Sequence, residues 1–93
     1  MRPSRLAQVI AEEFGCVREN ILQKGKKGNI PRDLAIYLSK DMTGETGVAL
    51  GRYFGGISGA GIVYKYNQVI KQTKTDRKLK GRVNQIRKRI LNT

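Results

Sequence analysis

The sequence predicts an all-α fold, a compact bundle of about six helices. Apolar residues recur at spacings of three and four along most of the chain, which is the helical period. No stretch shows a convincing apolar–polar alternation of period two, so we expect no sheet. Good N-capping residues and glycine or proline stops punctuate the pattern. Ninety-three residues suffice for one small core, so we expect a single domain over residues 1–93.

The first two helices are expected before residue 24. Residues 4–15 carry one apolar stripe, formed by Leu6, Val9, Ile10 and Phe14. Ser4 is the expected N-cap of this helix and Gly15 its expected stop. A short second helix follows at residues 17–23, anchored by Val17, Ile21 and Leu22.

A basic loop then separates the second and third helices. Residues 24–29, KGKKGN, combine three lysines with two glycines and have no apolar anchor. Pro31 fits the first turn of a helix, where its missing N–H has no partner to lose. The third helix is expected to end at Gly44 and carries an apolar row at spacing four, formed by Leu34, Leu38 and Met42.

Three more helices are expected after residue 45. Thr46 is a good N-cap for a brief helix, which Gly55-Gly56 ends. Ser58 is a good N-cap for a longer helix that runs to about Thr73. The expected core residues of these two helices are Leu50, Phe54, Ile62, Tyr66 and Val69. Asp76 precedes a basic final helix at about residues 76–91, with one apolar stripe formed by Leu79, Val83, Ile86 and Ile90.

The charge balance points to a polyanionic partner. Lysine plus arginine number 19 against 7 aspartates and glutamates, a formal charge of +12. Such a small body repels itself, and nucleic acid is the leading explanation, with an anionic membrane surface second. No apolar run approaches the roughly 20 residues that span a bilayer. The single cysteine, Cys16, suits a reducing compartment, so we expect a cytoplasmic protein. With nucleic acid as its partner, we expect it to be associated with the nucleoid.

Catalytic chemistry is poorly supplied. The chain has no histidine and one cysteine, so a zinc site with the usual ligand count is excluded. Among the acids only Glu12 and Glu13 are adjacent, and neighbours on a helix point in different directions. We therefore expect no enzyme, no cofactor, no metal and no small-molecule substrate.

The glycine-rich stretch at residues 49–66, ALGRYFGGISGAGIVYKY, fails as a nucleotide-binding loop. A Walker loop requires lysine and then serine or threonine after its last glycine, and here Ile62 and Val63 follow Gly61. A dinucleotide fingerprint requires a preceding strand and a third glycine, whose place Tyr64 takes.

A helix-turn-helix at about residues 46–72 explains the same stretch. That motif needs a short helix, a glycine-containing turn and a second helix at a steep angle. The second helix enters the major groove by its N-terminal end, here residues 58–61, whose small side chains allow close approach. A plain helical hairpin, in which the glycines only permit tight packing, is the alternative.

Residues 31–56, PRDLAIYLSKDMTGETGVALGRYFGG, resemble the C-terminal duplex-DNA-binding domain of the bacterial replication initiator family DnaA. The shared positions are Pro31-Arg32, Ala35, Tyr37-Leu38, Thr43, Gly51 and Phe54-Gly55-Gly56. The similarity in helix order extends from about Leu6 to the final helix. The FGGIS turn at residues 54–58 also resembles the tails of REP-associated tyrosine transposases. The resemblance implies a Trp-repressor-like helix-turn-helix domain that binds double-stranded DNA.

One departure from the initiator pattern concerns base recognition. In the initiators, Arg-Asp-His-Thr-Thr follows the paired glycines and reads bases. Here Ile57, Ser58, Gly59, Ala60 and Gly61 take those places. We therefore expect phosphate clamping with limited base reading, and a transposase tail or stand-alone relative fits better than a replication initiator.

The expected DNA contacts fall into three groups. The resemblance assigns phosphate and minor-groove contacts to Lys24, Lys26, Lys27 and Arg32. Arg52 and Lys65 flank the turn, and Ser58, Gly59 and Ala60 form the tip of the second helix. The basic groups of the tail are expected to form a solvated face without base contacts: Arg77, Lys78, Lys80, Arg82, Arg87, Lys88 and Arg89. A module for structured RNA and a protein-assembly module are the alternatives, and the target site and oligomeric state stay open.

Overall fold

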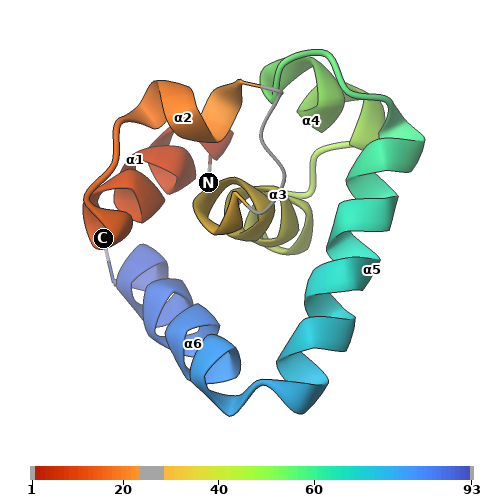
Figure 1. Cartoon of the computed structure of the whole chain (residues 1–93). Helices are drawn as coiled ribbons and strands as arrows, with labels where there is room; N and C mark the ends of the chain where they lie inside the picture. The colour runs from red at the N-terminus through yellow and green to blue at the C-terminus, as the bar shows by residue number, and fades with distance from the viewer. Residues whose placement is uncertain (1, 24–28, 93) are drawn as a thin grey trace.

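The described part of the chain folds into a bundle of six helices (Figure 1). The computed structural model describes residues 2–23 and 29–92, and no strand occurs among them. The helices are α1 (Pro3–Phe14), α2 (Arg18–Leu22), α3 (Ile30–Met42), α4 (Gly47–Tyr53), α5 (Gly59–Thr75) and α6 (Arg77–Leu91). The predicted all-α class and the number of helices are confirmed. In this part of the chain, no helix combines the length and the apolarity that a membrane crossing requires.

Helix α3 lies in the middle of the bundle. In Figure 1 it is seen nearly end-on, with α1 and α2 on one side and α4 and α5 on the other. Helix α6 leaves the end of α5 and returns to α1. All six helices or their caps supply buried apolar side chains to one cluster, whose largest members are Phe54, Leu6, Ile10, Ile21, Leu34, Ile36, Leu38, Leu50, Ile62, Ile86 and Ile90. Of the predicted core positions, Leu50, Phe54, Ile62 and Val69 are buried, and Tyr66 is half-buried.

Side-chain caps fix where α4, α5 and α6 begin. Their three N-cap side chains each accept a hydrogen bond from the N–H three residues later, at 3.0 to 3.1 Å: the predicted caps Thr46 and Ser58, and Asp76. The prediction for Ser4 is wrong, because α1 already begins at Pro3 and Arg2 is its N-cap. Proline is favoured at the first helical position, where its fixed φ suits the helix and its missing N–H is not needed.

Two of the predicted helix stops have different outcomes. Gly15 ends α1 in the left-handed conformation, at φ 63°, as predicted. Helix α3 ends at Met42, before the predicted Gly44. The Thr43 hydroxyl donates to the Ser39 carbonyl oxygen at 2.6 Å, and this local bond competes with a further helical turn.

Helix α6 is docked on α1 by two arginines. The Arg89 guanidinium lies 2.6 Å from a Glu12 carboxylate oxygen and 3.3 Å from one of Glu13. Arg82 stacks on the Phe14 ring at 4.1 Å and donates to the Glu13 carbonyl oxygen at 3.1 Å. Stacking and hydrogen bonding together order these side chains more firmly than an exposed ion pair alone does.

A third arginine joins α6 to α3. Arg87 lies 3.1 Å from an Asp41 carboxylate oxygen and donates to the Tyr37 hydroxyl at 3.2 Å. Tyr37 in turn stacks on Tyr66 of α5, with ring centroids 5.1 Å apart. The expectation of a wholly solvated tail is therefore wrong for Arg82, Arg87 and Arg89, which contact the rest of the bundle.

The backbones of α4 and of the turn after it touch directly. We call residues 46–64, which hold α4, this turn and the first turns of α5, the α4–α5 corner. Gly55 and Gly56 both have positive φ, 86° and 83°, and the Gly56 N–H donates to the Gly51 carbonyl oxygen at 2.8 Å. A Cβ on Gly51 would lie 2.0 Å from the Ile57 carbonyl oxygen, so only glycine fits there.

We expect Gly51→Ala to lower the free energy of unfolding by about 2–3 kcal/mol, because the added methyl forces two backbone segments apart. Gly81→Ala is the matched control, since nothing lies within 4 Å of a Cβ built on this glycine in α6. That change should raise stability by about 0.5–1 kcal/mol. Urea unfolding of both variants measures the difference, and equal stability of the two would refute the close contact.

Candidate nucleic-acid interface

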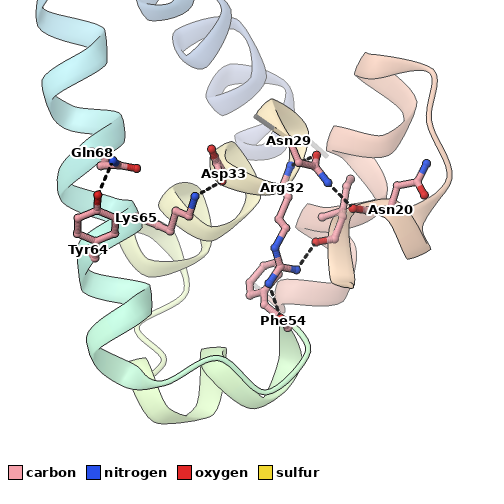
Figure 2. Close-up of polar contacts among 9 residues, drawn as sticks. Asn20, Asn29, Arg32, Asp33, Phe54, Tyr64, Lys65 and Gln68 are labelled. Atoms are coloured by element: carbon pink, nitrogen blue, oxygen red, sulfur yellow. Dashed lines mark hydrogen bonds and ion pairs between the residues drawn. The ribbon is translucent and has the colours of Figure 1, made fainter. Parts of the chain in front are cut away.

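The Arg32 guanidinium joins three parts of the chain in the interior. The residue is only 6 % exposed. Its Nη1 donates to the Ile21 carbonyl oxygen at 2.9 Å and its Nη2 donates to that of Phe54 at 2.6 Å (Figure 2). Because Ile21 belongs to α2 and Phe54 caps the end of α4, the Arg32 side chain links α3 to both of these helices by hydrogen bonds. The planar fork of arginine suits two such bonds at once.

Burial changes the electrostatics of Arg32 but not its charge state. Loss of water lowers the pKa of the Arg32 guanidinium, and the neighbouring Asp33 carboxylate partly offsets that effect. An arginine starts from so high a pKa that it stays protonated. The side chain is thus a buried cation with carbonyl partners, and this corrects the prediction that it holds a phosphate.

Asn29 fixes the chain where the predicted basic loop ends. Its side-chain oxygen accepts from the Arg32 N–H at 3.1 Å and caps α3. Its Nδ2 donates to the Asn20 carbonyl oxygen at 2.7 Å, so the start of α3 is joined to α2 (Figure 2). Lys24, Lys26 and Lys27 lie outside the described residues. What is fixed is the point from which that segment enters α3.

Lys65 lies between α5 and α3. Its ammonium is 3.3 Å from an Asp33 carboxylate oxygen, and the two side chains are 35 % and 20 % exposed (Figure 2). Lys65, predicted as a DNA contact beside the turn, is thus partly exposed and already paired with a carboxylate. The side chain contributes to the packing of α5 on α3.

Of the three predicted tip residues, two are exposed and one is packed. Ser58 and Ala60 are exposed at the start of α5. Gly59 is half-buried, and a Cβ built on it would lie 3.5 Å from the Val48 Cγ2 and 3.6 Å from the Gly47 carbonyl carbon. The first residues of α5 are thus held against the first residues of α4, with the Ala60 methyl left outside.

Two arginines lie at the C-terminal end of α4, one on α4 itself and one on α2. Arg52, predicted as a contact, is exposed on α4. Arg18 of α2 was not singled out in the sequence, but it lies close enough to Tyr53 to affect its ionisation. Burial raises the pKa of the Tyr53 hydroxyl, and the positive charge of Arg18 opposes that rise. Arg18 is itself exposed, so two arginines from different helices flank this end of the corner.

The exposure of two apolar side chains of the corner, Val48 and Val63, was not predicted from the sequence. Val48 is 59 % exposed, Val63 43 % and Tyr64 60 %. Gln68 donates from Nε2 to the Tyr64 hydroxyl oxygen at 2.8 Å (Figure 2). Helical spacing in the sequence could have predicted this exposure, because positions 60, 63, 64 and 67 lie on the side of α5 opposite its buried Ile62 and Val69.

In the described part of the chain, no three His, Cys, Asp or Glu residues gather as a metal site would require.

The chain is similar to part of several chromosomal replication initiator proteins named DnaA. It is 32 % identical over 84 residues to that of Lactobacillus helveticus, covering 86 % of this chain and 18 % of the relative. It is 28 % identical over 87 residues to that of Thermus thermophilus, covering 91 % and 20 %. No protein-family model matches the chain. The chain thus resembles the C-terminal domain of DnaA and spans about a fifth of these relatives.

We expect Arg32→Met to lower the free energy of unfolding by about 2–4 kcal/mol, because two buried carbonyl oxygens lose their donors. Arg52→Met is the matched control, since it removes an exposed arginine of the same corner and should change stability by less than about 0.5 kcal/mol. Urea unfolding gives both values. Similar stability of the two variants would contradict the cross-linking role of Arg32.

Proposed function

We propose that this chain binds double-stranded DNA and that the α4–α5 corner acts as a helix-turn-helix. The first turn of α5 enters the major groove, and the basic segment at residues 24–29 holds phosphates beside it. In this proposal the chain forms one DNA-binding domain of a replication-initiator-like or transposase-like bacterial protein and works at the nucleoid in the cytoplasm. The resemblance to the C-terminal domain of DnaA supports this class of partner.

The observation that carries the proposal is the exposed start of α5. Ser58 and Ala60 face solvent, while Gly59 packs on α4 and the turn behind them is held by backbone contacts. The first N–H groups of a helix have no partners within the helix and suit a phosphate. A helix start that is narrow, exposed and rigidly held is the part that a major groove accepts.

The distribution of charge supports a polyanionic partner. Four of the seven acidic side chains, Glu12, Glu13, Asp33 and Asp41, are engaged in internal ion pairs. Their partners Lys65, Arg87 and Arg89 are three of the 19 lysines and arginines. Most of the positive charge is therefore left for the surface, where phosphates provide a favourable counter-charge.

We expect Ala60→Glu to lower affinity for a duplex at least tenfold, because the change puts bulk and negative charge on the exposed tip. The fold should be unaffected, since Ala60 is exposed and glutamate is a good helix former. Gln85→Glu is the control, because it adds the same charge at an exposed position of α6. Fluorescence anisotropy with a labelled duplex measures both. Equal affinities for the two variants would place the interface elsewhere.

We expect Lys26→Ala combined with Lys27→Ala to reduce the slope of log affinity against log salt by about 1.8, because each lost phosphate contact removes about 0.9. Lys78→Ala with Lys80→Ala is the control. It removes the same charge from exposed positions of α6 and should leave the slope nearly unchanged. A salt series from about 50 to 200 mM gives the slopes. If the control pair flattens the slope as much as Lys26 and Lys27, the basic loop has no special part in binding.

One competition experiment separates this function from its rivals. A labelled duplex is displaced by unlabelled duplex or by a structured RNA hairpin of equal length at about 150 mM salt. We expect the duplex to compete better, since single-stranded RNA is commonly recognised on exposed aromatic platforms and Tyr64 is the one tyrosine that is exposed among the described residues. Tighter binding of the hairpin would favour an RNA-binding module. Stable self-assembly without nucleic acid, and weak binding of both, would favour an assembly module.

A further inference from the structure

One exposed surface of the α4–α5 corner is apolar although the chain is strongly basic. We call this surface, formed by Val48, Ala60, Val63 and Tyr64, the tip of the corner. Six large apolar side chains are exposed in the described part of the chain, and three of them, Val48, Val63 and Tyr64, belong to this corner. Single exposed apolar residues are common on protein surfaces, but a contiguous group indicates a contact surface.

These side chains form one continuous surface. A Cβ on Gly59 would lie 3.5 Å from the Val48 Cγ2, so α4 and α5 meet there. Gly59 and Val63 are four residues apart on α5, as are Ala60 and Tyr64, and residues at this spacing are neighbours on a helix. Two adjacent rows therefore carry the apolar surface from the Val48 side chain to the Tyr64 ring.

Charged base contacts are missing from this tip. Between residues 58 and 68 the sole charged side chain is Lys65, which is paired with Asp33. The most common contact to guanine uses arginine or lysine, and cytosine is contacted by carboxylates. Neither contact is available from the first turns of α5.

The tip does offer one oriented hydrogen-bond donor. The Tyr64 hydroxyl oxygen accepts from Gln68 at 2.8 Å, which holds the phenol in place (Figure 2). A tyrosine hydroxyl has one proton of its own to donate. With the amide of Gln68 occupying one side of the oxygen, that proton is available for an acceptor in front of the tip.

We propose that the α4–α5 corner recognises thymine in the major groove of its duplex, an inference that rests on the proposed function. Thymine presents there a C5 methyl group and an O4 acceptor. The methyl groups of Ala60 and Val63 contact the C5 methyl, and the Tyr64 hydroxyl donates to O4. This recognition uses side chains of this chain in place of the initiator signature that residues 57–61 lack.

The test removes or adds the methyl group alone. Affinity is measured for a duplex of A·T pairs and for the same duplex with deoxyuridine in place of thymine. Affinity is also measured for a duplex of G·C pairs in mixed sequence and for the same duplex with 5-methylcytosine in place of cytosine. We expect deoxyuridine to weaken binding about fourfold for each contacted methyl, from about 0.8 kcal/mol per buried group. Methylation of cytosine should strengthen binding of the G·C duplex.

Variants assign the effect to named side chains. Val63→Ser should reduce the difference between thymine and deoxyuridine. Val17→Ser should not, because Val17 is similarly exposed, at 58 %, but precedes α2. Tyr64→Phe should weaken both duplexes about fivefold and equally, since both bases keep O4 and one hydrogen bond of ordinary strength is lost. Circular dichroism checks that each variant keeps its helices.

The two proposals fail in different ways. Tight duplex binding with equal affinity for thymine and deoxyuridine would overturn thymine recognition and leave DNA binding intact. Loss of discrimination in Val17→Ser as well as in Val63→Ser would also overturn it. Absence of tight binding to any duplex would overturn the proposed function itself.

Discussion

The two hydrogen bonds of the Arg32 guanidinium determine how the α4–α5 corner sits on the rest of the molecule. From α3, which lies between α2 and α4, they reach the Ile21 carbonyl oxygen of α2 and the Phe54 carbonyl oxygen at the end of α4. A buried cation is costly unless its N–H groups find well-placed hydrogen-bond acceptors, so the arrangement tolerates little variation. Because Asn29 caps the same helix and bonds to Asn20, the start of α3 and the corner are fixed to one framework.

Close backbone contact makes the corner itself rigid. Gly51 lies against the Ile57 carbonyl, and Gly59 lies against the start of α4. These backbone contacts fix the conformation of the turn, so the direction of α5 follows from the direction of α4. Lys65 and Asp33 add a contact from the outer side of α3 to α5. The result is that one end of α5 is presented to solvent in a fixed orientation, and we propose that a duplex is bound there.

The sequence predicted the elements of the fold better than their long-range contacts. Helical periodicity and the caps Thr46, Ser58 and Asp76 are local features, so they could be read from neighbouring residues. The partners of Arg32 lie 11 and 22 residues away, and Arg89 reaches Glu12 across 77 residues. Nothing local distinguishes such arginines from surface ones. The same reason explains why Arg32 and Lys65 were expected at the interface, although Arg32 is buried and Lys65 pairs with Asp33 of α3.

The most direct test of this account is a titration of the isotopically labelled chain with duplex DNA, followed by NMR of the backbone amides. We expect the largest shifts at Ser58, Gly59, Ala60 and Gly61 and on the outer side of α5 at Val63 and Tyr64. The amides of α1 and of the second half of α6 should change little. Shifts concentrated on α1 and α6, with the start of α5 unperturbed, would contradict the account.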